Sequence, residues 1–240
     1  MLYKGHPRDQ LLDVVSNGIV IDVFSAEEAL FLDELIGRDA KKINEATFGA
    51  FFRSLQIILG RHLILVVNRI FEYPNPRHQL RSIPVALQIL ESHADNLKIE
   101  QRSLLKKKLR SVNLVQEEQE FDSLTDFELT AILTEYFRKN LPRADLTRPE
   151  GLSKALNALR KARNKQIAHH EAIESKNLPK ATYAEIDQLV AYAKQFLAII
   201  GDAYLSARYE FEDGTYRFTS DAKRAARCVK RLLVKAGVYL

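Results

Sequence analysis

The sequence predicts an all-α fold, an up-and-down helical bundle, and three observations support this prediction. Apolar residues recur at three- and four-residue spacing over long stretches, which is the periodicity of a buried helix face. Pairs of Ser or Thr with an acid three residues later, such as Thr182 and Glu185, are typical of helix N-termini. The chain has only 9 Gly in 240 residues, so it is poor in a residue that turn-rich β folds use heavily.

The first half of the chain contains four expected helices. Ser25 and Glu28 form a possible capping box, and the helix that they open ends at Gly37. A long helix follows, because apolar residues from Phe48 to Val66 keep helical spacing until the Pro-rich segment after residue 73. The next helix tolerates Pro84 in its first turns. The last of the four is a charged surface helix. The expected ranges are 26–36, 40–71, 80–93 and 98–117.

The second half predicts further helices and one short β-hairpin. Helix starts are expected at Ser123, at Thr147 and at Thr182, each followed by an acid three residues later. Residues 209–218 alternate apolar and polar side chains around Asp213-Gly214, a favoured hairpin turn. A basic helix over 220–235 closes the chain. The expected domains are a helical bundle over 1–206 and a hairpin-plus-helix appendage over 207–240.

Charge is concentrated at the end of the sequence. Residues 221–240 carry six basic side chains and one acid, so this segment alone accounts for the net charge of +5. A basic patch of this kind suits a phosphate-rich partner such as RNA, although a solvated helix face is the commoner reading. The candidate RNA-binding residues are Lys223, Arg224, Arg227, Lys230 and Arg231.

Other features bear on the compartment of the protein. The single cysteine, Cys228, excludes an intrachain disulfide, favours a reducing cytoplasmic setting, and is expected to be a small packing residue. The N-terminus lacks the apolar core of a signal peptide. The most apolar stretch, 55–71, is interrupted by polar and charged residues, so no membrane insertion is expected.

The segment 152–170 departs from the pattern of an ordinary amphipathic helix. Apolar positions at 152, 156 and 159 continue at 163, 167 and 170, where Arg163 and His170 stand. The adjacent stripe of the same helix, through positions 155, 159, 162 and 166, reaches His169. Since a buried arginine without a partner is costly, an anion or a neighbouring polar group should compensate its charge.

The sequence Arg163-Asn-Lys-Gln-Ile-Ala-His169 resembles the HEPN signature, which is an Arg followed by a polar residue and, after four to six intervening residues, a His. The order of residues in this motif is especially similar to that of the abortive-infection AbiU-like branch. The resemblance implies a HEPN-type bundle and a metal-independent endoribonuclease that needs no cofactor. It also implies a toxin or phage-defence effector in which two motifs meet across a homodimer. RNA is the implied substrate, and a cognate antitoxin is a further candidate partner.

The resemblance assigns roles that suit the residue types. Arg163 would hold the scissile phosphate, His169 would act as acid and base on the RNA 2′-hydroxyl and leaving oxygen, and Asn164 would orient them. On a straight α-helix His169 lies about 120° from Arg163, whereas the seven-residue step to His170 nearly restores the face. The family pattern favours His169; a bend, a partner subunit's arginine, or catalysis by His170 remain alternatives.

Three other interpretations stay open. The chain could be a non-catalytic HEPN module that binds RNA, nucleotide or a partner protein. It could be a dimerisation bundle in which Arg163 and the histidine only stabilise an interface, or the motif could be a capped, solvated helix end. A metal pair of His170 and Glu174 is a poor candidate without a third ligand. The remaining histidines, at 6, 62, 78 and 93, are expected to be isolated packing or surface residues.

Overall fold

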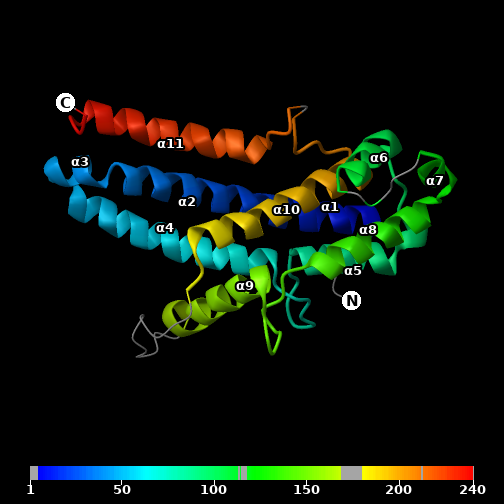
Figure 1. Cartoon of the computed structure of the whole chain (residues 1–240). Coiled ribbons are helices and arrows are strands. Elements are labelled where there is room, and N and C mark those ends of the chain that lie inside the picture. Colours follow the sequence, from blue (N-terminus) through cyan, green and yellow to red (C-terminus); the bar gives the residue numbers. More distant parts are fainter. Residues whose placement is uncertain (1–4, 113, 115–117, 169–179, 212, 240) are drawn as a thin grey trace. The chain divides into compact units, whose positions relative to one another are not determined.

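The computed structural model describes residues 5–112, 114, 118–168, 180–211 and 213–239 and is built from helices (Figure 1). The described residues form no β-strand, only isolated bridges such as that between Asn75 and His78. The predicted all-α helical bundle is therefore confirmed. The α-helices are α1 (Pro7–Val14), α2 (Val20–Arg38), α3 (Ala40–Glu45), α4 (Gly49–Ile70), α5 (Ile83–Ser92), α6 (Arg102–Ser111), α7 (Glu118–Ser123), α8 (Asp126–Asn140), α9 (Gly151–Ala162), α10 (Tyr183–Tyr204) and α11 (Arg217–Lys235). Short π-helical segments cover Val15–Ile19 and Arg163–Ala168, and a 3₁₀ turn covers Ala94–Asn96.

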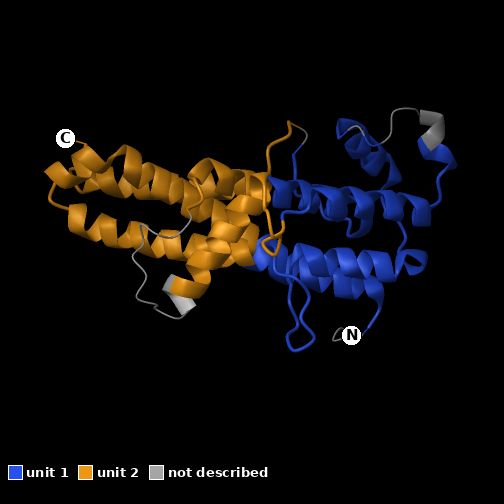
Figure 2. Ribbon diagram, turned by 60° about the horizontal axis from the view of Figure 1, so that its bottom comes forward, with its two compact units in different colours: residues 1–21, 69–142, 191–211 blue, residues 22–68, 143–190, 212–240 orange. Residues whose placement is uncertain are grey.

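The chain folds into two compact units, coloured separately in Figure 2. Unit 1 contains residues 1–21, 69–142 and 191–211, and unit 2 contains residues 22–68, 143–190 and 212–240. Each unit thus combines segments that are distant in the sequence. The division into domains at residue 206 remains a prediction.

Unit 1 has an aromatic core formed by α8 and the second half of α10. The ring of Phe137 lies 5.0 Å from that of Phe196 and 6.1 Å from that of Tyr192, both edge-to-face, a favoured geometry for aromatic pairs. The hydroxyl of Tyr192 donates to the carbonyl of Phe137 at 2.7 Å, so this buried polar group is satisfied. α5 packs against α8. There, the guanidinium of Arg138 donates two hydrogen bonds of 2.7 and 2.9 Å to the carboxylate of Glu91 on α5.

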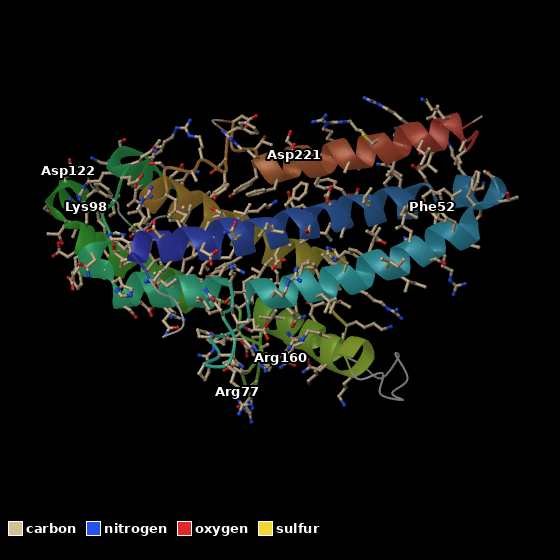
Figure 3. All side chains as sticks on the ribbon, turned by 180° about the vertical axis from the view of Figure 1, so that it is seen from behind. Phe52, Arg77, Lys98, Asp122, Arg160 and Asp221 are labelled. Atoms are coloured by element: carbon tan, nitrogen blue, oxygen red, sulfur yellow. The ribbon has the colours of Figure 1, made fainter. Side chains whose placement is uncertain are left out.

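Unit 2 has a core to which α11 contributes. Leu233 and Val238 pack in one buried cluster with Ile36, Ile43 and Phe52, which come from α2, α3 and α4. Figure 3 labels Phe52 on α4. The basic terminal helix is thus fixed by apolar contacts within this unit.

The helix starts follow the capping signals only in part. At α10 the prediction is confirmed, because Thr182 Oγ1 accepts from the Glu185 N–H while the Glu185 carboxylate accepts from the Thr182 N–H at 2.7 Å. The box opening α8 is built on Thr125 and Glu128, two residues after the predicted Ser123. Ser25 lies inside α2, so the helix start expected there is wrong.

Two further predicted boundaries are also wrong. α9 begins after Glu150, which makes no side-chain cap, and not at Thr147. The predicted helix over 40–71 is interrupted at residues 46–48, where Thr47 has a φ of 66°. Gly49 restarts the helix against Asn44, whose Oδ1 would lie 2.0 Å from a Cβ at that position. A side chain at residue 49 would therefore displace the amide of Asn44.

The described residues of 209–218 form no strand, so the predicted hairpin is not supported. Within unit 1, Tyr209 lies against Gly201 of α10, where a Cβ would approach its ring to 2.6 Å. Glu210 forms an ion pair with Lys108 of α6. In unit 2, Phe218 is buried in the first turn of α11, which begins at Arg217. These three residues therefore contact helices or lie within one.

α4 is the one described helix that is long and apolar enough to cross a membrane by length and composition alone. In its most apolar 18-residue window, 22% is buried. Core helices pass the same test, and Phe52, Leu63 and Val66 on α4 are buried. The absence of membrane insertion remains a prediction.

Candidate HEPN motif site

The motif follows directly from the buried face of α9. Ala155, Leu156, Ala158 and Leu159 are buried, and this face leads to Arg163, which is half-buried at the helix end. The apolar spacing of the sequence placed Arg163 on the buried face of the helix, and the partial burial of its side chain agrees with that position. Asn164, the next residue, is exposed.

The helix changes its hydrogen-bonding pattern at the motif. The N–H of Arg163 donates to the carbonyls of both Leu159 and Arg160, and Arg163–Ala168 then form a π-helical segment. π-helical turns widen the helix by one residue per hydrogen-bonded ring and occur frequently at functional sites. The straight α-helical register on which His169 and His170 were compared therefore does not apply across residues 163–168. No residue type in this stretch marks the change, so sequence reasoning missed it.

Arg163 and Asn164 form a hydrogen-bonded pair. Arg163 Nε donates to Asn164 Oδ1 at 3.1 Å. The guanidinium has five N–H donors, so the other four are carried by its two Nη atoms. The same contact uses the Asn164 oxygen as acceptor and leaves its Nδ2 as the donor end of the amide.

Basic residues surround this pair on the same segment. Between Gly151 and Ala168 the sequence has five basic residues and no acid. Arg160, labelled in Figure 3, and Lys161 are exposed one turn before Arg163. Sequence reasoning concentrated on Arg163 and missed this run, although the run of basic residues was readable there.

A comparison with protein families decides what the motif belongs to. The family model HEPN_AbiU2, described as AbiU2, matches residues 30–225, which include the motif and the N-terminal half of α11. This chain belongs to the AbiU2 family of HEPN proteins. The match confirms the family expected from Arg163 to His169 and makes this an abortive-infection-related HEPN domain. No curated protein and no solved structure matches the chain.

The two candidate histidines of this AbiU2 protein, His169 and His170, lie outside the described residues, as does Glu174. The choice between the histidines therefore remains open. Among the residues that the structure does describe, no group of three or more His, Cys, Asp or Glu side chains could hold a metal ion.

The predicted RNA-binding residues of the AbiU2 chain lie on α11, which belongs to the same compact unit as Arg163. Phe218, Ala222 and Leu233 form its buried side, and Asp221, labelled in Figure 3, is its only acid. The candidate residues are all exposed: Lys223, Arg224, Arg227, Lys230 and Arg231. Lys223 Nζ lies 5.8 Å from the centre of the Phe31 ring, a cation–π contact within unit 2.

Cys228 is exposed on this helix. The expectation that it would be a packing residue is therefore wrong. The helix packs through Phe218, Ala222 and Leu233, and Cys228 lies outside that stripe.

Proposed function

We propose that this AbiU2-family protein is a metal-independent endoribonuclease of a toxin or phage-defence system, acting as a homodimer. The observation that carries the proposal is the pairing of Arg163 with Asn164 in a π-helical segment at the end of α9. A half-buried guanidinium oriented by a neighbouring amide is suited to holding a phosphate group.

The proposed reaction uses the RNA as its own nucleophile. The working histidine, His169 by the family pattern, removes the proton of a 2′-hydroxyl, and the oxygen attacks the adjacent phosphorus. The bond to the 5′-oxygen breaks, the leaving oxygen receives a proton, and a 2′,3′-cyclic phosphate remains. Arg163 stabilises the charge that grows on the phosphate oxygens.

α11 gives the protein sequence-independent affinity for RNA. Five exposed basic side chains on one helix can neutralise phosphates and release counterions, and this type of binding weakens as salt rises. Because the helix is held by Leu233 in the core of unit 2, its basic side is presented on a fixed element.

The test is incubation of the full chain with labelled single-stranded RNA in EDTA, beside Arg163→Ala, His169→Ala and His170→Ala. Matched controls are Arg77→Ala and His62→Ala, which remove exposed side chains of the same types elsewhere. Cleavage to 2′,3′-cyclic phosphate ends should be lost in Arg163→Ala and in one histidine variant and kept in both controls. Cleavage that persists in Arg163→Ala and in both histidine variants would refute the proposal.

The dimer is tested by mixing two inactive variants. If Arg163 of one subunit works with His169 of the other, a mixture of Arg163→Ala and His169→Ala should recover cleavage after subunit exchange. Each variant alone should stay inactive, and each should elute as a dimer. A monomeric wild-type chain that cleaves RNA would refute the homodimer.

A further inference from the structure

Unit 2 contains an acidic pocket with a volume of about 400 Å³, formed by the C-terminal part of α2 and the first turns of α10. Four of its nine lining residues are acids and none is basic. Leu30, Phe31 and Tyr183 supply the apolar part of the lining. The pocket is therefore suited to a positively charged group on an apolar stem. The four acids are Glu27, Asp33, Glu34 and Asp187.

The four carboxylates differ in what holds them. Glu27 is 2% exposed and accepts a hydrogen bond from the hydroxyl of Thr219 on α11 at 2.6 Å. Asp33 accepts a hydrogen bond from the hydroxyl of Tyr183. The carboxylates of Glu34 and Asp187, by contrast, are exposed, and neither forms an ion pair with any residue that the structure describes. These two charges are therefore the ones that an incoming cation would meet.

α4 carries the opposite charge on an exposed side, defined here by Phe51, Arg53, Ile57, Ile58 and Arg61. The helix contains no acid, and among the described residues neither of these two arginines forms an ion pair. Phe51 and Ile58 are more than 60% exposed, at 65% and 61%. Large apolar side chains exposed beside arginines are typical of a surface that another protein covers.

The acidic pocket and the exposed side of α4 adjoin each other within unit 2. Figure 1 shows α2 beside α4, and Ile36 and Phe52 of these helices share one buried cluster. Gly37 lines the pocket, and a Cβ at this residue would lie 4.0 Å from Nε2 of Gln56 on α4. Arg53 stands three residues before Gln56, about one helical turn away. Unit 2 therefore presents two neighbouring surfaces of opposite charge.

The charges decide between the possible partners of this region. RNA or an anionic membrane would be attracted by the arginines of α4 but repelled by the four carboxylates beside them. Antiparallel pairing of α4 with the same helix of a second copy, centred on Ile57, would place Arg53 beside Arg61 of the partner subunit, which is also repulsive. A two-fold arrangement that exchanges the two surfaces avoids both conflicts, because each arginine-bearing side then meets a pocket.

We propose that unit 2 binds a second copy of this chain by exchange, so that Arg53 and Arg61 of each copy bind the acidic pocket of the other. Their guanidinium groups pair with the carboxylates of Glu34 and Asp187, and their stems lie against the apolar lining. The exposed apolar side chains of α4 are covered in the same contact. The inference rests on the homodimer of the proposed function and is independent of RNA cleavage.

The test measures the dissociation constant of the dimer by sedimentation equilibrium of the full chain. Two double variants each reverse the charge of one surface: Arg53→Glu/Arg61→Glu and Glu34→Lys/Asp187→Lys. Alone, each should raise the Kd of the dimer at least about 100-fold, because like charges then face each other. An equimolar mixture of the two should form a heterodimer, because the reversed surfaces complement each other at both contacts.

Matched controls reverse exposed charges outside this region. Arg77→Glu/Arg148→Glu and Asp95→Lys/Glu135→Lys change the same numbers of charges and should keep the Kd of wild type. Circular dichroism checks that every variant keeps the helicity of wild type. If a reversal variant loses helicity, the neutral variants Arg53→Gln/Arg61→Gln and Glu34→Gln/Asp187→Asn take its place and should each raise the Kd about tenfold.

Each contrary outcome identifies what is wrong. A pocket variant that dimerises like wild type would overturn the exchange, even if the α4 variant dissociates, because α4 would then bind another surface. Folded variants whose mixture stays monomeric would also overturn it. A monomeric wild-type chain would remove the interface together with the homodimer. RNA cleavage and its loss in Arg163→Ala are measured separately, so the interface and the ribonuclease activity fail independently.

Discussion

Arg163 Nε and Asn164 Oδ1 are joined by a hydrogen bond of 3.1 Å between adjacent residues, at the position where α9 becomes π-helical. The bond uses one N–H of the guanidinium and fixes the direction of the plane that carries the other four. It also fixes the amide of Asn164, so the two side chains form one polar unit.

The pair predicts different results for two substitutions of Asn164. Asn164→Ala removes the orienting bond and should lower RNA cleavage. Asn164→Asp keeps an acceptor but adds a negative charge beside the phosphate, and it should lower RNA affinity by roughly a further fivefold, the scale of an exposed ion pair. Cleavage rates and RNA binding by filter retention measure both. Equal affinity of the two variants would show that Asn164 does not lie beside a bound phosphate.

Arg163→Lys separates charge from geometry. Lysine keeps the positive charge but lacks the planar fork that matches a phosphate, so substrate binding should change little while the rate constant for cleavage falls about 10²-fold. Single-turnover kinetics over a range of protein concentrations separate the two quantities. A lysine variant as fast as wild type would assign Arg163 only an electrostatic role.

The sequence predicted the motif better than its surroundings, for physical reasons. The spacing of apolar residues in α9 predicted that Arg163 lies at the end of a buried helix face. This prediction was possible because helical spacing involves only residues that are close in the sequence. The π-helical segment depends on which carbonyl receives each N–H, which residue types do not reveal. The hairpin was predicted from alternation alone, whereas in the structure Tyr209 lies against Gly201, eight residues earlier, and residues from Arg217 onward belong to α11.

The basic side of α11 predicts a salt dependence. The double variant Lys230→Ala/Arg231→Ala removes two exposed charges, and each phosphate contact to single-stranded RNA contributes about 0.7 to the slope of log affinity against log salt. The slope should therefore become shallower by about 1.4. Lys139→Ala, an exposed lysine of α8, should leave the slope unchanged. An unchanged slope in the double variant would remove α11 from the RNA-binding surface.

Unit 1 offers a stability test in its core. Thr130 Oγ1 donates to the Asp126 carbonyl at 2.6 Å and lies 2.8 Å from the hydroxyl of Tyr204. Because a hydroxyl has one proton, Tyr204 is the donor in the second contact. Burial is the main cause that raises the pKa of Tyr204, so this hydroxyl stays protonated over the working range of pH.

The two single variants should therefore differ. Tyr204→Phe should cost about 1 kcal/mol in free energy of unfolding, the value of one hydrogen bond. Thr130→Val should cost about 1–3 kcal/mol, since it leaves the Tyr204 hydroxyl buried without an acceptor. The double variant should cost less than the sum of the single variants. Urea denaturation measures all three, and strict additivity would contradict the contact.

The capping box of α10 predicts a dependence of stability on pH. The backbone N–H of Thr182, and then its hydroxyl, hold the pKa of Glu185 below its usual value of 4.5. A carboxyl group whose pKa is lowered by folding stabilises the folded state above its ordinary pKa, and this contribution is lost as pH falls through the lowered pKa. Glu185→Gln should therefore lower the melting temperature at pH 7, and its difference from wild type should shrink as pH falls from about 4.5 towards 3. Glu135→Gln, which changes an exposed acid on α8, is the control for general charge effects. A difference for Glu185→Gln that stays constant from pH 7 to pH 3 would show that the ionised carboxylate does not stabilise the start of this helix.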